Sequence, residues 1–415
     1  MSAGTVHVLG GVQTDFARRW GRESGRPLAS MLESAVQDCL DETGVPARQV
    51  GTVHVGNFAG ERFAGQSHLG ALACSLYPEW ASLPASRHEA ACASGSMAAL
   101  AAMAEIEAGR YETALVVGVE LMRNVPGSTA AEYLGCAASV PDELNADVLP
   151  WPSLFDAIAQ ETERRYGLDH AHLGRIAELN RSNAVRNPWA QTRDWVSSPG
   201  EFSADDVANP TVVGRTRKSD CGRITDGASA VLLAGPRFAA RWARRHPRRL
   251  LSTVRGWGHR TAPLSLADKL TLSRDSEYMF PNMRAAIVDA YTRAGIAGPG
   301  DVDVIETHDC FTITEYVALD HFGLTKPGRA WEAVEDDRIG FNGSIPVNPS
   351  GGLIGAGHPV GATGVRILLD AHRQVTDTAG EYQVPRARTA ATLNVGGSCS
   401  TAASFVVGTA DEHTR

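Results

Sequence analysis

The chain has 415 residues, 43% of them hydrophobic, which is typical of a globular protein with two or three lobes and well-formed cores. Its 47 Asp and Glu residues outnumber its 39 Lys and Arg residues, and the net charge of −8 at pH 7 argues against a nucleic-acid-binding protein. The one basic cluster, from Arg241 to Arg249, is expected to form a solvated helix face and loop.

The sequence contains no run of about 18 apolar residues and no charged leader followed by an apolar segment. We therefore expect a cytoplasmic protein without a membrane span. Its seven cysteines are odd in number and scattered, and none forms a Cys-x-x-Cys pair. Reduced thiols and no metal site are expected.

Short apolar strands alternate with amphipathic helices in the first part of the chain. Strands are predicted at residues 6–9, 50–55 and 114–119, and helices at residues 28–42 and 94–108. This alternation is typical of an α/β domain built from βαβ units.

The pattern then loosens between residues 122 and 218, where only two clear helices are predicted, at 152–166 and 173–185. A core strand follows at 226–234, and a second βα series begins near residue 251. This order indicates an inserted lobe followed by a weak repeat of the first domain. A duplicated α/β domain would bring the helix starts of its two halves to one central crevice.

Cys92 lies among small residues immediately before the predicted helix at 94–108. The positive end of a helix lowers the pKa of a nearby thiol, so we expect a reactive cysteine here. For a lone cysteine, an inert thiol packed in an Ala-rich helix would be the better interpretation. The other motifs of the chain favour the reactive one.

The predicted strand at 302–307 ends in His308 and Cys310. Functional groups commonly lie at such strand ends in α/β folds, although a surface histidine and a packed cysteine are an equally good interpretation of this segment alone.

His358 lies in a glycine-rich run and precedes Pro359, which indicates an imidazole on a stiff turn that is suited to act as a general base. A dinucleotide-binding loop is disfavoured because no strand directly precedes Gly355 and the glycine spacing does not fit. The last motif, at residues 392–404, predicts a strand that enters a glycine turn, whose N–H groups can bind an oxyanion.

Together these segments resemble the thiolase family over essentially the whole chain. Cys92 matches the acyl-accepting cysteine of that family, His358 the histidine of its Gly-His-Pro motif, and residues 225–230 the strand after its inserted loop domain. The resemblance implies the duplicated thiolase fold, an α/β architecture of five layers (α-β-α-β-α) with an inserted loop domain.

The domain boundaries expected from this resemblance are residues 1–121 with 226–255 for the N-terminal domain, 122–225 for the loop domain and 256–415 for the C-terminal domain.

Two motifs depart from the common thiolase pattern. Many members have Asn-Glu-Ala-Phe where this chain has His308-Asp-Cys-Phe311, and Cys-x-Gly where it has Asn394-Val-Gly396. The first motif is similar to that of the sterol-carrier-protein-type thiolases, which implies that Cys310 takes over the acid/base task of the missing second cysteine. Cys399 lies beyond the family position and is expected to be a packed thiol.

The resemblance implies an acyltransferase that cleaves 3-ketoacyl-CoA with CoA, or runs the reverse Claisen condensation, through an acyl group on Cys92. His358 would accept the thiol proton and Cys310 would protonate the departing enolate. His308 and His358 would bind the enolate oxygen, and the N–H groups of Cys92 and Gly396 the thioester oxyanion.

CoA would be substrate and product, with no other cofactor, in lipid metabolism, and the chain would form a homodimer or homotetramer. The alternative is a thiolase-like aldolase or scaffold that depends on a small OB-fold, zinc-ribbon partner. Such chains often lose the nucleophile, which Cys92 retains. Ketoacyl synthases and a non-enzymatic lipid-binding module fit the four motifs less well.

Overall fold

The computed structural model describes residues 5–23, 25–140, 142–144 and 149–410. Among these residues the main feature is a mixed nine-stranded sheet of order β3-β2-β4-β7-β1-β8-β11-β10-β9. Its strands, in chain order, are β1 (Val6–Gln13), β2 (Val53–Gly56), β3 (Ala85–His88), β4 (Thr113–Glu120), β7 (Gly227–Ala234), β8 (Ser252–Thr261), β9 (Val304–Thr307), β10 (Thr389–Gly396) and β11 (Thr401–Thr409).

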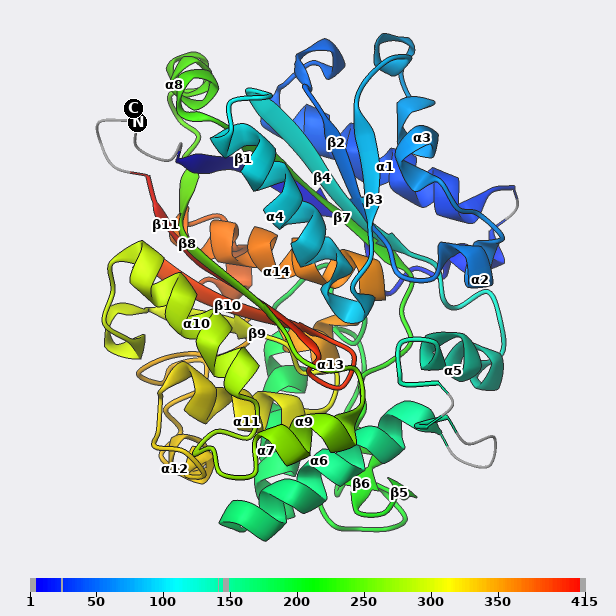
Figure 1. Cartoon of the computed structure of the whole chain (residues 1–415), viewed down its shortest axis with the longest axis vertical. Helices are drawn as coiled ribbons and strands as arrows, with labels where there is room; N and C mark the ends of the chain where they lie inside the picture. Colours follow the sequence, from blue (N-terminus) through cyan, green and yellow to red (C-terminus); the bar gives the residue numbers. More distant parts are fainter. Residues whose placement is uncertain (1–4, 24, 141, 145–148, 411–415) are drawn as a thin grey trace.

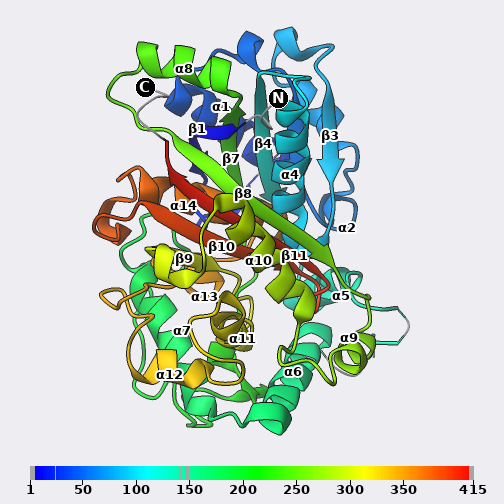
Figure 2. The same cartoon turned by 60° about the vertical axis from the view of Figure 1, so that its left-hand side comes forward.

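Two half-sheets meet where β1 pairs with β8, from Val6 opposite Val254 to Val8 opposite Ser252. In the first half β2 runs parallel to β3 and β4, and in the second β9 runs parallel to β10, while the other pairs are antiparallel. In Figures 1 and 2 the first half-sheet lies in the upper part of the view and the second half-sheet, with β8, β11 and β10, lies below it.

Helices cover both half-sheets and fill the space between them. The longer helices are α1 (Pro27–Thr43), α4 (Ser94–Glu107), α5 (Gly127–Gly135), α6 (Pro150–Tyr166), α7 (His170–Ala184), α8 (Pro236–Arg245), α10 (Pro281–Ala294), α11 (Thr312–Phe322) and α14 (Val360–Val375). The shorter ones are α2 (Gly60–Ala64), α3 (Leu69–Cys74), α9 (Leu266–Leu272), α12 (Ala330–Glu335) and α13 (Gly352–Ala356).

The layers follow from the contacts of these helices. Helix α1 packs on β1 and β7, α4 and α14 lie between the half-sheets, and α10 packs on β8 and β11. This order confirms the expected five-layered duplicated fold, and the strands and helices predicted in the first part of the chain are present within a few residues. No helix among the described residues is long and apolar enough to cross a membrane.

The segment between the neighbouring strands β4 and β7 contributes α5, α6, α7 and the small hairpin of β5 (Thr211–Val213) and β6 (Thr216–Arg217) to the lower lobe of Figure 1, where it lies beside α9, α11 and α12. It corresponds to the predicted inserted lobe. The exact domain boundaries stay a prediction, and the one expected between residues 255 and 256 falls inside β8.

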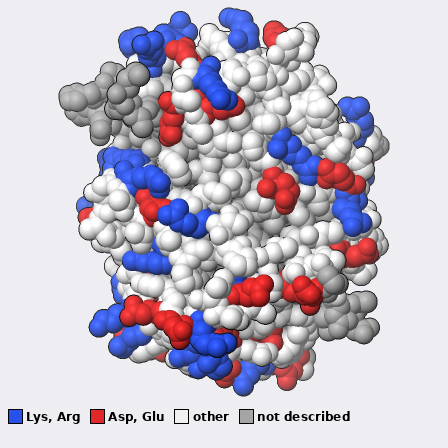
Figure 3. All heavy atoms as spheres, viewed as in Figure 1, with Lys and Arg blue, Asp and Glu red and all other residues white. Residues whose placement is uncertain are grey.

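Arginines of the cluster from Arg241 to Arg249 lie on α8 and the loop after it, mostly exposed, as expected. Arg241 pairs with Glu112 and Arg249 with Glu42. Figure 3 shows basic and acidic side chains interspersed over the visible face, without a patch of one sign that would attract a polyanion.

Helix α14 is buried along its whole length at the centre of the molecule (Figure 1). It approaches β4 and α4 closely because glycines line the contacts. A Cβ atom added to Gly118 of β4 would lie 2.6 Å from Ala362 Cα, and one added to Gly95 of α4 would lie 2.8 Å from Val365 N. Both distances are shorter than real Cβ atoms allow, so these positions require glycine.

Gly118→Ala should therefore destabilise the protein by about 2 kcal/mol, because the backbone of α14 must move to accept the methyl group. Gly127→Ala is the matched control, since an added Cβ there meets no atom within 4 Å, and its effect should stay within about 0.5 kcal/mol. Urea unfolding of both variants measures the two free energies. Equal values for the two variants would contradict the role assigned to the α14 contact.

Candidate functional site

A cavity of about 460 Å³ opens between the lower lobe and the two half-sheets. Cys92, Cys310, His358 and Gly397 line one part of it. Most of the remaining wall is apolar and includes Phe58, Met122, Leu134, Trp151, Phe155 and Phe311. The cavity thus joins the four sequence motifs to side chains of the inserted lobe.

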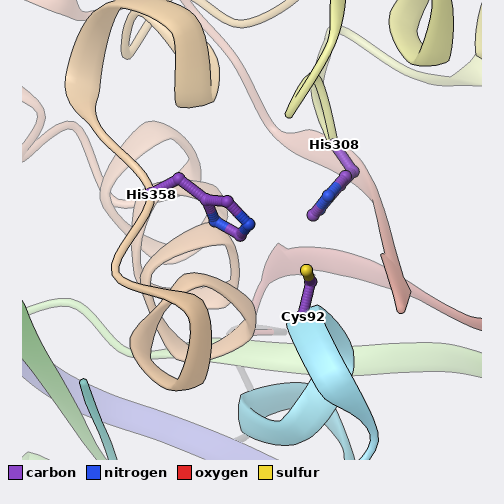
Figure 4. Close-up of side chains that lie close together, drawn as sticks. All are labelled: Cys92, His308 and His358. Carbon is purple, nitrogen blue, oxygen red and sulfur yellow. The ribbon is translucent and has the colours of Figure 1, made fainter. Parts of the chain in front are cut away.

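Three of the predicted residues converge at one point, although they come from distant parts of the chain. Cys92 lies in the turn before α4, His308 in the loop after β9, and His358 in the loop before α14. The Cys92 sulfur and one ring nitrogen of each histidine all lie within 4.8 Å of one another. Figure 4 shows the three side chains pointing toward a common space.

The turn that carries Cys92 is held in an unusual backbone conformation. Ala91 has φ of +50°, a region that non-glycine residues seldom adopt. The Ser94 hydroxyl stabilises it by accepting from Ala90 N at 3.0 Å and donating to Ala91 O at 2.6 Å. This turn points the sulfur of Cys92 into the cavity, away from the body of α4.

Hydrogen bonds assign the tautomer of His358. Its Nδ1 lies 2.7 Å from the Thr363 hydroxyl, which itself donates to Pro359 O at 3.0 Å. Because that hydroxyl proton is already used, His358 Nδ1 is the donor and Nε2 has a free lone pair. Nε2 is buried and has no hydrogen-bond partner among the residues that the structure describes. The ring therefore presents a base to the Cys92 thiol.

His308 has the opposite arrangement. Asn394 accepts from the Ser96 hydroxyl through Oδ1 and donates through Nδ2 to Cys92 O and to His308 Nδ1. Since His308 Nδ1 accepts, its proton is on Nε2, which is buried and finds no partner in the described part of the chain. His308 thus presents a hydrogen-bond donor where His358 presents an acceptor.

The surroundings keep all three groups uncharged near neutral pH. Burial, and then the charge of Arg366, lowers the pKa of His358 to about 3, and burial lowers the pKa of His308 well below its usual value. Burial also raises the pKa of the Cys92 thiol to about 12, although Cys92 stays partly exposed and a backbone N–H from Gly397 favours its thiolate. The expectation that the helix start lowers this pKa is therefore wrong, because desolvation is the larger effect.

Cys310 lines the same cavity and is 8% exposed. Its sulfur lies 4.0 Å from the Thr314 hydroxyl, and burial followed by the nearby Cys92 raises the pKa of its thiol well above the usual value. It is therefore a protonated thiol beside the nucleophile, able to give a proton to a basic carbon. Cys399 is 1% exposed and does not line the cavity, in agreement with the packed thiol that was expected.

The glycine turn after β10 also reaches the site. Gly397 lines the cavity, and its N–H lies near enough to the Cys92 sulfur to favour the thiolate, whereas Gly396 packs against Ala90. The oxyanion role of Gly396 stays a prediction. Gly397, Asn394 and Thr363 were not predicted from the sequence as site residues. The Gly396-Gly397 pair was the signal that could have indicated Gly397.

The cluster of Cys92, His308 and His358 also contains the atom types that bind zinc. In the tautomers assigned above, His308 Nε2 carries a proton and offers no lone pair to a metal. The expected absence of a metal remains a prediction.

The chain is similar to known proteins over most of its length. A family model described as "Thiolase, N-terminal domain" matches residues 6–192, and one described as "Thiolase C-terminal domain-like" matches residues 265–409. An acetyl-CoA acetyltransferase of Methanothermobacter thermautotrophicus is 32% identical over 96% of this chain and 98% of its own.

Human sterol carrier protein 2 is 28% identical over 94% of this chain and 70% of its own. Among solved structures, the Ltp2-ChsH2(DUF35) aldolase superposes with a TM-score of 0.77 over all of both chains at 17% identity, which is a likeness of fold.

The protonation states predict how Cys92 reacts with iodoacetamide. Only the thiolate is nucleophilic, and below a pKa of about 12 its fraction rises roughly tenfold per pH unit. Alkylation of Cys92 should therefore accelerate steadily from pH 7 to pH 10, as followed by peptide mass spectrometry with Cys92→Ala as the blank. A plateau with a midpoint near pH 7 would instead indicate a thiolate–imidazolium pair in the resting protein.

Proposed function

The chain belongs to the thiolase family and is a thiolase-type acyltransferase, and we propose that it works through an acyl group carried on Cys92. In one direction it would cleave a 3-ketoacyl-CoA with CoA, and in the other it would condense two acyl-CoA molecules. The observation that carries this proposal is the convergence of the Cys92 sulfur with one nitrogen each of His308 and His358.

Acylation begins with transfer of the Cys92 proton to His358 Nε2. The sulfur attacks the 3-keto carbon as its proton leaves, so a charged thiolate need not accumulate in an apolar cavity. The oxygen of the substrate then becomes negative and needs hydrogen-bond donors. The N–H groups of Cys92 and of the glycine turn are the proposed donors.

Breaking the carbon–carbon bond releases an enolate of acyl-CoA. His308 supplies a suitable donor for the enolate oxygen, because its Nε2 carries a proton and faces the site. Cys310 would give its proton to the enolate carbon and recover it when a CoA thiol attacks the acyl group on Cys92. In condensation the same residue would remove the proton from the α-carbon.

The apolar cavity wall is suited to an acyl group. Trp151, Phe155 and Phe311 present carbon surface to the cavity that Cys92 also lines, and Phe155 stacks on Phe311 with ring centroids 4.3 Å apart. We further propose a cytoplasmic homodimer or homotetramer that acts in lipid metabolism, as the family resemblance implies.

Intact-protein mass spectrometry after brief exposure to acetyl-CoA tests the covalent step. The wild-type protein should gain one acetyl group that maps to Cys92, and Cys92→Ala should gain none while remaining folded by circular dichroism. A folded wild-type protein without an adduct would contradict the proposal and would favour the aldolase or scaffold alternative, in which a small OB-fold, zinc-ribbon partner is needed.

Cys310→Ala should separate the two half-reactions. Its acetylation from acetyl-CoA should stay near the wild-type rate, whereas cleavage of acetoacetyl-CoA should fall by about 100-fold, the usual contribution of a general acid or base. Cys221→Ala is the matched control, because Cys221 also lines the cavity but has no proposed role. Intact cleavage by Cys310→Ala would place the acid/base elsewhere.

Thr363→Val tests the tautomer of His358. The substitution keeps the shape of the side chain but removes the acceptor of the Nδ1 proton, so the ring loses its fixed orientation. We expect acetylation of Cys92 to slow by about tenfold. Thr376→Val is the control, since the Thr376 hydroxyl bonds back to His372 O at the end of α14, remote from His358 in the sequence. Equal rates for the two variants would contradict the assignment.

A further inference from the structure

A lysine ammonium group is buried behind the glycine turn of the site. Lys269 lies on α9 and is 4% exposed. Its Nζ donates to Pro263 O (3.2 Å), Leu264 O (2.8 Å), Ser398 Oγ (2.9 Å) and Ser400 Oγ (2.7 Å). Among the described residues no carboxylate lies within ion-pair distance of it, so every acceptor is a neutral oxygen.

Such an environment is unfavourable for a charge. Burial lowers the pKa of Lys269 to about 8, while Cys399, Glu143 and Asp268 raise it only through longer-range attraction. A well-packed apolar side chain of similar volume would avoid this desolvation. Packing alone therefore does not explain why a lysine occupies this position.

Its two serine partners flank Cys399 in the turn that joins β10 to β11. A bond from Ser400 N to Gly396 O (3.0 Å) closes this turn, in which Gly397 and Cys399 have φ of +64° and +63°. The other side of this turn packs against the turn that carries Cys92. A Cβ added to Gly396 would lie 3.3 Å from the Cβ of Ala93. Residues 396–400 are called the catalytic turn below.

We propose that Lys269 is a positioning residue that holds the catalytic turn against Cys92. Through Ser398 and Ser400 it ties the turn to residues 263 and 264, and the turn in consequence keeps the Gly397 N–H directed at the Cys92 sulfur. The carbonyl oxygen of an acyl group on that sulfur would lie beside the same N–H groups. The inference rests on the proposed function, in which Cys92 is acylated.

The position of these donors matters because oxyanion stabilisation depends on geometry. Loss of a single oxyanion donor costs about 100-fold or more in rate, and a displacement of about 1 Å has a similar effect. Alkylation of the same sulfur by iodoacetamide develops no negative oxygen. The two reactions therefore separate a displaced turn from a generally damaged site.

Lys269→Met is the direct test, and single-turnover acetylation of Cys92 by acetyl-CoA is the measurement. We expect acetylation to slow at least about tenfold, with the loss in kcat and not in KM. Alkylation by iodoacetamide should slow by a clearly smaller factor, because it loses only the help that the Gly397 N–H gives to the thiolate. Ser265→Ala is the matched control. It removes the hydroxyl that caps α9 through Asp268 N without touching the catalytic turn, and it should acetylate at the wild-type rate.

A second variant keeps the test decisive if Lys269→Met does not fold. Ser398→Ala combined with Ser400→Ala removes the two side-chain acceptors in the turn and leaves Lys269 in place. It should also slow acetylation at least about tenfold, and adding Lys269→Met to it should have little further effect, because the residues act as one unit.

The inference would be overturned if Lys269→Met were acetylated at the wild-type rate. If Lys269→Met does not fold, the same result with the double serine variant would overturn it. Equal losses of acetylation and alkylation would overturn it as well, because the damage would then lie at the thiol and not at the oxyanion donors. Failure of the wild-type protein to acetylate would instead contradict the proposed function, so the two failures are distinguishable.

Discussion

The close approach of helix α14 to β4 and α4 is the constraint on which the site depends. His358 lies just before the first turn of α14, and Cys92 just before the first turn of α4. Glycines at positions 95 and 118 bring these elements together, since a side chain at either position would meet the backbone of α14. The separation of nucleophile and base is therefore set by contacts within the core, well away from the cavity surface.

A helix buried on every side needs internal partners for its polar groups, and the partners of Arg366 on α14 also bear on the site. Arg366 donates to Ser350 Oγ and Asp370 Oδ2, both at 2.8 Å. Its charge contributes to the lowered pKa of both His308 and His358. At the start of the helix, Glu120 accepts from Gly361 N at 3.0 Å and thereby ties α14 to the end of β4. The same buried network thus ties down the helix and adds to the effect of burial, which is the larger cause of the lowered pKa of both histidines.

The sequence predicted the layered α/β fold and most of the site because its signals are local. Small residues around Cys92, the glycine run around His358 and the strand end before His308 are each visible within about a dozen residues. Asn394 was not predicted as a site residue, because its role depends on a contact with Cys92 O across 302 positions of the chain. Lys269 likewise acts through Ser398, 129 positions away. The pKa of Cys92 was misjudged since burial by other segments cannot be read from the helix start.

An uncharged resting site is consistent with a cavity that has few polar groups in its wall. A preformed thiolate and imidazolium would require water or fixed dipoles to stabilise them, and the cavity offers mainly aromatic and aliphatic surface. The fixed donors that are present, the His308 Nε2 proton and the N–H of Gly397, lie around the sulfur, where a substrate oxygen would become negative. The site thus disfavours charged side chains before substrate binds and stabilises the negative charge on the substrate oxygen as the reaction develops it. This is the condition for lowering the activation barrier without stabilising the ground state.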